Sequence, residues 1–410
     1  MARRVIVTDV HDRAGLGACR SLRSSGFLVT GVASAHPAPG HWSRSCSERF
    51  ALVDPRRDPA AYVEGLEAIV SRGDYDVLMP GSDASLLAVS ERRAALEGRV
   101  KLGLPSDEVV RKTLDKRALL SAAAEAGLAC PDTVVCSSRQ AAIRSGRHFG
   151  FPVIVKPRST IFEDRGELFQ LGSLRADDSD DFEGIVRRVG TPFLVQRAEE
   201  GDQYSVAGVI AEGQLIVSAV SRYIRTWPVK TGRAAFSETV IPPNGLVGRV
   251  ERLVREFGWQ GIFELELIRR PDGSFAAIDF NPRLYGSIVL AESAGASIPT
   301  AWCEWLLGLK PKPVAVSARP GLRYRWEDAD LRHGLWQIRR GNVGRALRVL
   351  HPYRHVVHAH VGLTDPAPLL ARLILLLRNR YGDPQRPFAR PSLRAETRLA
   401  SETETLVKDT

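Results

Sequence analysis

The sequence predicts an α/β protein with at least two domains, and three observations lead to that fold class. Its 410 residues exceed what one hydrophobic core usually organises. Near the N-terminus, short apolar runs alternate with helical patterns, which favours a small parallel sheet covered by helices. Further along, two runs of alternating apolar and polar residues flank Pro271-Asp272-Gly273, which is typical of an antiparallel hairpin.

Residues 1–112 form the first predicted domain. Gly15-Leu16-Gly17 follows its first strand, but Arg20 stands where a dinucleotide-binding fingerprint needs a third glycine, so no such site is expected. The loop at 80–83 lies where open α/β sheets bind ligands. Asp83 could hold a substrate amine there, but we favour Ser82 or Asp83 as a helix N-cap. Strands are expected at 5–7, 28–32 and 77–79, and helices near 14–25, 59–71 and 84–96.

Composition narrows the function classes. With 44% hydrophobic and 25% charged residues, the chain reads as a soluble globular protein, and no run approaches membrane-spanning length. Five scattered cysteines without a C-x-x-C pair argue against a disulfide framework or a zinc site, so a reduced, cytoplasmic protein is expected.

The net charge of +10 is concentrated after residue 310. A basic region of this kind can indicate a nucleic-acid or anionic membrane surface. Its arginines lie at helical spacing without a nucleic-acid-binding motif, so we interpret them as compositional. Residues 310–410 are predicted to be a basic C-terminal region with a linker at 311–313, a helix near 366–380 and a disordered end after Pro391. Its histidines lack metal-ligand spacing and are interpreted as structural or surface residues; they are His351, His355, His358 and His360.

The hairpin around Pro271-Asp272-Gly273 is the predicted site of the chemistry. If its last two residues form the turn, Glu266 pairs with Asp279 and Glu264 pairs with Asn281. The side-chain period of two places these four groups on one face of the hairpin. The other face should then carry Phe263, Leu265, Ile278 and Phe280.

Opposed carboxylates destabilise a sheet, so a folded protein needs a reason to keep them. A hard cation, Mg²⁺ or Mn²⁺, supplies that reason, because carboxylate and amide oxygens suit such ions. Arg283 follows on the same face and could hold a phosphate through two hydrogen bonds. The alternative is a solvated sheet face with ordinary surface acids. With the acids opposed in this way, neutralising Asp279 should relieve a repulsion between the strands.

A second unit is predicted at 113–309, with a smaller lobe at about 113–195. A helix rich in Leu and Ala is expected at 114–126, and an apolar strand at 152–157. Lys156 lies at the end of that strand, where a cation aimed at phosphates explains it better than packing does. A second hairpin is expected about Glu212-Gly213. It is followed by four cations that suit either an anionic substrate or a solvated loop, namely Arg222, Arg225, Lys230 and Arg233.

Several of these residues resemble one family. Glu266, the run Asp279-Phe280-Asn281-Pro282-Arg283 and the run Ala291-Glu292-Ser293-Ala294-Gly295 resemble the metal-binding end of ATP-grasp ligases, in the form found in carbamoyl phosphate synthase. That family usually has E-x-N-P-R in the second strand, so Asp279 is shorter by one methylene. The resemblance implies that Glu266, Asp279 and Asn281 hold two Mg²⁺ ions on the ATP phosphates. It also implies a catalytic role for Arg283 at the γ-phosphate.

The resemblance also implies a set of ATP contacts. Lys116 and Lys156 match the family's two small-lobe cations. The run at 193–204, FLVQRAEEGDQY, resembles the strand that clamps adenine. Gln203 stands at the position where the family usually has a carboxylate that binds the ribose hydroxyls. Glu199, Glu200 or Asp202 could make that contact instead. Adenine itself would be read by Gln196 and by the backbone of Arg197 and Ala198.

The implied fold has a pre-ATP-grasp α/β domain followed by a two-lobed ATP-grasp domain. The segment at 158–180 resembles the family's phosphate-covering loop in position only, because its glycines are sparse. The implied activity is phosphorylation of a carboxylate by ATP to an acyl phosphate, which an amine then displaces. The expected partners are small-molecule carboxylates and amines, such as amino acids or peptides, and not nucleic acid.

Other functions stay open at this stage. The nucleophile could be a thiol instead of an amine, or the chain could be a nucleotide-binding module without turnover. A nucleic-acid binder comes last. The identity of both substrates and the oligomeric state, including a homodimer, are not determined by the sequence.

Overall fold

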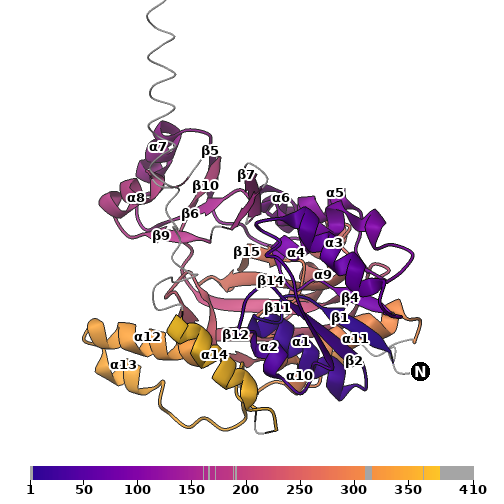
Figure 1. The fold of residues 1–410 in the computed structure, drawn as a ribbon. Helices are drawn as coiled ribbons and strands as arrows, with labels where there is room; N and C mark the ends of the chain where they lie inside the picture. The colour runs from indigo at the N-terminus through magenta and orange to yellow at the C-terminus, as the bar shows by residue number, and fades with distance from the viewer. Residues whose placement is uncertain are drawn as a thin grey trace, which may run out of the picture.

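A computed structural model describes residues 3–378, except residues 160, 165–166, 171, 188, 190–191, 310–315 and 363. The N-terminal domain is a four-stranded parallel sheet in the order β3-β2-β1-β4 (Figure 1). Its strands are β1 (Arg4–Val7), β2 (Leu28–Ala33), β3 (Glu48–Ala51) and β4 (Val77–Met79). Its helices are α1 (Arg13–Ser24), α2 (Pro39–Trp42), α3 (Pro59–Val70) and α4 (Asp83–Glu91).

Three strands and three helices of this domain were predicted and are confirmed. The missed strand, β3, is an edge strand whose residues alternate between half-buried and exposed, so it lacks the apolar run that marks the others. Ser82 caps α4 through reciprocal hydrogen bonds with Ser85, which confirms the capping interpretation of the loop at 80–83.

The small lobe is an antiparallel sheet in the order β5-β10-β6-β9. The predicted strand at 152–157 is β6, and the predicted helix at 114–126 is α6. The division into domains at residue 113 stays a prediction, and Thr113 lies within α5. The elements are α5 (Asp107–Leu114), α6 (Lys116–Glu125), β5 (Thr133–Cys136), α7 (Arg139–Phe149), β6 (Val153–Pro157), β9 (Leu174–Ala176), α8 (Ser179–Val186) and β10 (Phe193–Arg197).

The segment at 158–180 contains a two-stranded ribbon, β7 (Ile161–Asp164) with β8 (Glu167–Gln170). Gly172 is exposed, and Gly166 lies outside the described residues. The predicted phosphate-covering loop is therefore a β-ribbon that precedes β9.

The large sheet has eight strands in the order β15-β14-β11-β12-β13-β17-β18, with β16 on β12. The predicted turn at Glu212-Gly213 is confirmed, because Ala211 pairs with Gln214 and both turn residues have positive φ. The elements before the C-terminal region are β11 (Asp202–Ala211), β12 (Gln214–Trp227), β13 (Arg233–Thr239), α9 (Leu246–Glu256), β14 (Gly261–Arg269), β15 (Phe275–Asn281), α10 (Ile288–Ser293) and α11 (Ile298–Leu306).

The hairpin of β14 and β15 has the predicted pairs, Glu266 with Asp279 and Glu264 with Asn281. The predicted two-residue turn is wrong. The Arg270 N–H donates to the Ser274 carbonyl, so three residues form the loop, and a register shift after Glu266 restores the pairing.

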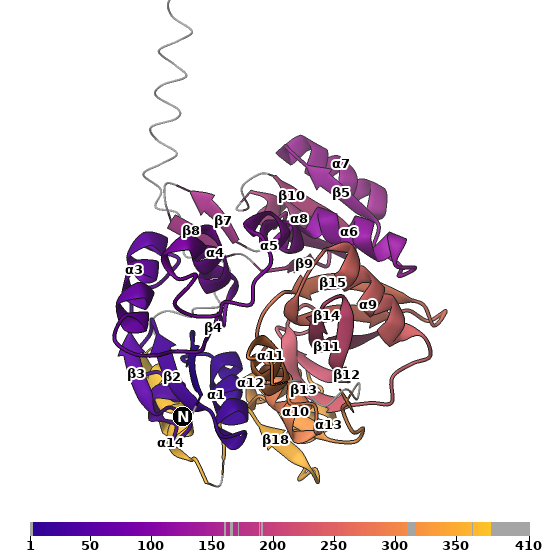
Figure 2. The same ribbon diagram turned by 90° about the vertical axis from the view of Figure 1, so that its right-hand side faces the viewer.

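That shift also corrects the predicted apolar face. Ala277, opposite Leu267, is buried with Phe280, whereas Ile278 is only half-buried. Helix α9 packs on the apolar face through Val250, Leu253, Val254 and Phe257. β15 is an edge strand of the large sheet, and α6 of the small lobe packs against it (Figure 2). The hairpin therefore lies where the two lobes meet.

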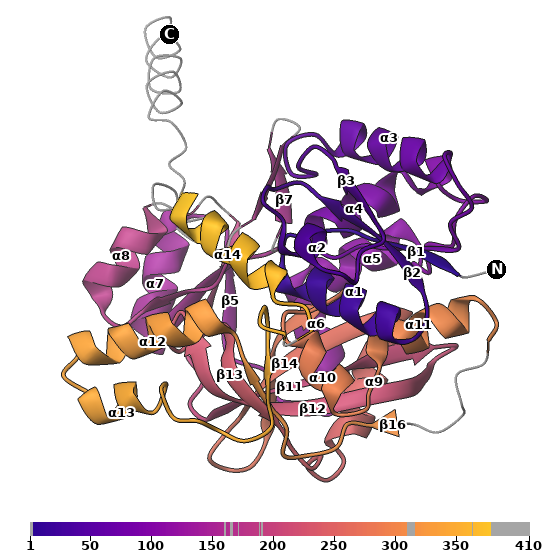
Figure 3. The same ribbon diagram turned by 60° about the horizontal axis from the view of Figure 1, so that its bottom comes forward.

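The C-terminal region is continuous with the large sheet, because β17 pairs with β13 and β18 pairs with β17. Arg20 of α1 also binds Asp365 at 3.1 Å, which ties this region to the N-terminal domain (Figure 3). The predicted helix near 366–380 is α14, while the linker at 311–313 and the end after Pro391 lie outside the described residues. The elements are β16 (Val316–Ser317), β17 (Arg323–Arg325), α12 (Glu327–Arg339), α13 (Val343–Leu347), β18 (Val356–His358) and α14 (Ala367–Arg378). Among the described helices, none combines the length and apolarity needed to cross a bilayer.

Candidate active site

Three carboxylates and an amide meet on the site face of β14 and β15. Glu264 is 4% exposed and accepts hydrogen bonds from the Asn281 amide and the Tyr223 hydroxyl, both at 3.2 Å. Gln203 of β11 donates to Glu266 at 3.1 Å. The predicted metal-binding residues are therefore neighbours, and Gln203 contacts one of them directly.

Two lysines of the small lobe approach the same hairpin. The Lys116 Nζ lies 2.6 Å from the Asp279 Oδ1, and the Lys156 Nζ donates to the Ile278 carbonyl at 2.9 Å. Both lysines are less than a tenth exposed. Ile278 lies at the register shift, where its carbonyl accepts from this lysine across the lobes. The two predicted cations therefore lie at the predicted acidic hairpin.

The protonation of these groups follows from burial and from the neighbouring charges. Burial, together with the carboxylates of Glu264 and Asp279, raises the pKa of Glu266 to about 8. Burial also lowers the pKa of Lys156 to about 8. Burial opposes ionisation of Asp279 as well, but Lys116 and Lys156 outweigh it and hold its pKa below the usual value. Asp279 is therefore the ionised carboxylate of the pair, and Glu266 is the one that holds a proton at neutral pH.

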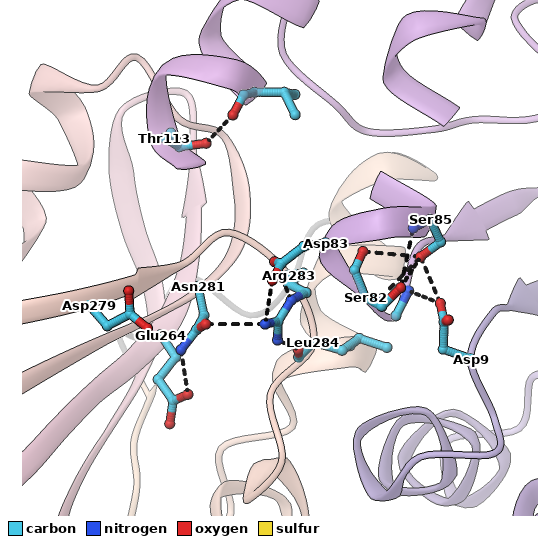
Figure 4. A network of polar contacts seen from close by, with 12 residues as sticks. Asp9, Ser82, Asp83, Ser85, Thr113, Glu264, Asp279, Asn281, Arg283 and Leu284 are labelled. Atoms are coloured by element: carbon cyan, nitrogen blue, oxygen red, sulfur yellow. Dashed lines mark hydrogen bonds and ion pairs between the residues drawn. The ribbon is translucent and has the colours of Figure 1, made fainter. Parts of the chain in front are cut away.

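Arg283 is held by a carboxylate of the N-terminal domain (Figure 4). Its guanidinium forms a two-point ion pair with Asp83, the first residue of α4, with an Nη2–Oδ2 distance of 3.0 Å. The same group donates to the Asn281 side chain at 3.2 Å and to the Leu284 carbonyl at 2.9 Å. Arg283 thus connects the acidic hairpin to the first domain.

Comparisons with known proteins agree with this architecture. No family model matches the chain. The carbamoyl phosphate synthase large chain of Rubrobacter xylanophilus is 28% identical over 308 residues, which cover 69% of this chain and 27% of that protein. The chain has the fold of the ATP-grasp ligases. It spans about a quarter of the length of the curated relatives that it matches.

Solved structures share the fold. An L-amino acid ligase from Bacillus licheniformis superposes with a TM-score of 0.58 at 17% identity, covering 76% of this chain and 75% of that one. The biotin carboxylase domain of the Hydrogenobacter thermophilus 2-oxoglutarate carboxylase, in complex with MgADP, ADP and bicarbonate, gives a TM-score of 0.59 at 13% identity. That alignment covers 79% of this chain and 73% of that one.

The residues predicted to read adenine lie on β10 and just after it. The Gln196 side chain is 4% exposed and donates to the Thr133 hydroxyl at 2.9 Å. The Arg197 N–H donates to the Asp132 carbonyl, and the Ala198 N–H donates to the Pro152 carbonyl. These amide groups are engaged in this conformation, so adenine recognition by this chain stays a prediction.

The predicted ribose contacts are separated by the fold. Glu199 forms a two-point ion pair with Arg270, at the end of the β14–β15 hairpin. Gln203 instead points to Glu266, in the acidic cluster. A role for either residue at the ribose stays a prediction.

The four cations predicted to follow the second hairpin are not all in a loop, because Arg222 and Arg225 lie within β12 and Arg233 begins β13. Arg225 is buried in an ion pair with Asp330, and Arg222 binds Glu238 at 2.7 Å. Arg233 is exposed and close enough to lower the pKa of Glu266. Arg222 and Arg225 therefore already have carboxylate partners, and an anion site at Lys230 and Arg233 stays a prediction.

Two contacts of the site were missed by sequence reasoning. Tyr223 hydrogen-bonds Glu264 from β12, and Asp83 neutralises Arg283 from α4. Asp83 is separated from its partner by 200 positions, and no local pattern connects them. Glu264 itself was predicted on this face, since it precedes Glu266 by the strand period of two.

Proposed function

We propose that this chain is an ATP-dependent ligase that activates a carboxylate as an acyl phosphate and transfers the acyl group to an amine. One observation carries the proposal. Glu266 and Asp279 pair across β14 and β15 while Lys116 and Lys156 reach the same hairpin from the other lobe. Opposed acids beside two buried cations suit a phosphate chain with its metal ions better than they suit a sheet surface.

The residues present fit Mg²⁺ or Mn²⁺ together with ATP. The described residues include no group of three His, Cys, Asp or Glu side chains that would hold a metal ion alone. Mg²⁺ commonly binds one or two carboxylates and completes its shell with substrate phosphates and water. Glu266, Asp279 and Asn281 supply such a partial oxygen set, and Glu264 lies behind it as a hydrogen-bond partner of Asn281. The ion would neutralise charge on the phosphates during transfer.

The chain's own residues would bind and orient the nucleotide. Lys156 and Lys116 would contact phosphate oxygens from the small lobe, where their burial strengthens charge-assisted hydrogen bonds. Glu266 would release its proton as the metal binds, because the raised pKa comes from burial and neighbouring carboxylates that a cation offsets. Arg283 would lie at the transferring phosphate from the N-terminal side, where Asp83 fixes its orientation.

A trapping assay tests this function without knowledge of the amine. The protein is incubated with ATP, Mg²⁺, hydroxylamine and a panel of carboxylates that includes amino acids and short peptides. We expect a hydroxamate and released phosphate with one class of carboxylate, and neither product with Asp279→Asn. Asp272→Asn, in the exposed turn of the same hairpin, is the matched control and should retain activity.

The outcomes separate the alternatives. Once the carboxylate is known, a screen of amines and thiols with product mass determination identifies the nucleophile. ATP binding without phosphate release or hydroxamate for any carboxylate would identify a nucleotide-binding module instead. The contacts of Arg283 with Asp83 and of Glu199 with Arg270 favour that second function, because both side chains already have protein partners.

A further inference from the structure

The helices α12 and α13 expose a row of large aliphatic side chains. Three on α12 follow the i, i+4, i+7 spacing of one helix face, and three along α13 and the turn after it repeat that spacing. Each is between 53% and 71% exposed. We call the six the aliphatic ridge, namely Leu331, Leu335, Ile338, Val343, Leu347 and Leu350. Exposed aliphatics are ordinary when scattered, but a row on two contacting helices is typical of a surface that another body covers.

The fold does not need the ridge, because the opposite face of α12 makes the internal contacts. Asp330 is 1% exposed and binds Arg225 and Arg325 of the large sheet. The His333 ring hydrogen-bonds the Thr226 carbonyl at 3.0 Å, and Gly334 leaves room for Val349. The two helices lie at one end of the molecule, away from the N-terminal domain (Figures 1 and 3).

The segment that carries the ridge is strongly basic. Between residues 331 and 364 the sequence has no Asp or Glu and six arginines, which are Arg332, Arg339, Arg340, Arg345, Arg348 and Arg354. The first two acids of α12 form ion pairs with residues outside the helix. Glu327 pairs with His358 and His360, and Asp328 pairs with Arg372. Arg340 also lies over the half-buried Trp336 ring, 4.9 Å from its centroid. The ridge thus lies in a segment whose positive charge no acid of that segment offsets.

The positive charge and the apolar side chains together indicate which kind of partner covers the ridge. A second copy of the chain would bring one set of arginines against another. Nucleic acid would use the arginines and leave the six aliphatics in water. An anionic lipid surface accommodates both, because aliphatic side chains enter the acyl boundary while arginines contact headgroup phosphates.

We propose that the α12–α13 hairpin docks this protein onto an anionic lipid surface. The ridge lies in the interface, and the flanking arginines bind lipid phosphates. The sequence alone attributed the arginines of the C-terminal region to overall composition. In this proposal, those on α12 and α13 bind lipid phosphates. This proposal does not depend on the proposed ligase activity, because no ridge residue belongs to the candidate active site.

Vesicle co-sedimentation of the full chain tests the proposal. We expect binding to vesicles of phosphatidylcholine mixed with phosphatidylglycerol, weaker binding to phosphatidylcholine alone, and release by salt. The double variant Leu335→Asp with Leu347→Asp should bind at least about tenfold more weakly, since two aliphatic side chains are lost from the interface. Arg345→Glu with Arg348→Glu should lose most of the preference for anionic vesicles.

Matched controls separate the ridge from general surface effects. Ile241→Asp changes an aliphatic side chain that is 77% exposed elsewhere, and Arg252→Glu reverses an exposed charge on α9. Both should bind vesicles as wild type does. All variants should melt at the wild-type temperature, because the changed side chains are exposed.

Three results would overturn the proposal. One is vesicle binding that the ridge variants leave unchanged. Another is a dimer in analytical ultracentrifugation that Leu335→Asp dissociates, with no vesicle binding, which would assign the ridge to a second copy. The third is tight binding to an oligonucleotide that Arg345→Glu abolishes and the ridge variants retain.

Discussion

Asp83 and Arg283 form a two-point ion pair between the first turn of α4 and the segment just after β15, the strand proposed to hold the metal. The side chains are 3% and 12% exposed, so water screens the pair little. Asp83 thereby fixes the direction of the one arginine that the family pattern places at the transferring phosphate. The N-terminal domain takes part in the candidate active site through this contact.

Breaking that pair should separate its structural role from its functional role. Asp83→Asn leaves a buried guanidinium without its carboxylate, so we expect a loss of about 3–5 kcal/mol in the free energy of unfolding without ligand. A bound phosphate would offer Arg283 another partner, so the melting shift caused by Mg-ATP should be larger than in wild type. Chemical and thermal denaturation measure both quantities.

Asp58→Asn, at the exposed N-cap of α3, is the matched control and should match wild type in both measurements. A Mg-ATP shift in Asp83→Asn no larger than that of wild type would argue that Arg283 does not meet the phosphates.

Removing the Lys156 charge should weaken ATP binding. Lys156→Ala deletes a charge-assisted contact in a buried site, and its loss should lower the affinity measured by calorimetry about tenfold or more. Lys156→Met keeps most of the side-chain volume and should show the same loss if charge is the cause. Lys112→Ala, an exposed lysine on α5, should bind ATP as wild type does. Unchanged affinity in Lys156→Met would make Lys156 a packing residue.

Neutralising Asp279 should lower stability, contrary to the sequence expectation. Repulsion from Glu266 alone predicts a gain, but Asp279 also contacts the Lys116 Nζ at 2.6 Å and interacts favourably with both Lys116 and Lys156. Asp279→Asn should therefore melt lower without ligand, and its Mg-ATP shift should shrink because a metal ligand is lost. A thermal series with and without Mg-ATP measures both effects. A lower melting point with the full nucleotide shift would show that Asp279 is structural only.

The raised pKa of Glu266 predicts how ligand-free stability varies with pH. Its pKa is about 8 in the folded chain and lies near 4.5 when unfolded, so the folded state binds more protons between these values. The contribution of this group to stability is complete below about pH 4.5 and is lost as pH rises through 8. Melting points from pH 5 to pH 8 should fall less steeply in Glu266→Gln than in wild type.

Mg²⁺ with ATP should flatten the same slope in wild type, because the bound ion favours the ionised carboxylate. The lowered pKa of Lys156 acts in the adjoining window, from about 8 to 10.5, and there it makes stability rise with pH. Parallel slopes in wild type and Glu266→Gln would place the raised pKa on another group.

The sequence by itself determined the local parts of this protein. The pairing of Glu266 with Asp279 follows from the strand period and from a turn between the strands, and both are set by neighbouring residues. It also predicted Lys156 at the end of a buried strand. The sequence did not reveal the three-residue loop or the register shift. A three-residue loop with one extra residue in β15 pairs Glu266 with Asp279 just as a two-residue turn would.

Only the tertiary structure decided what lies beside these local parts. The partners of Arg283, Glu199 and Asp279 come from α4, from the hairpin turn and from α6. Whether a cation is neutralised depends on such distant carboxylates, as the buried pair of Arg225 with Asp330 shows. Helical periodicity identifies the faces of α12 and α13, but packing determines which face is covered. These relationships depend on residues brought together by folding, and no spacing along the chain encodes them.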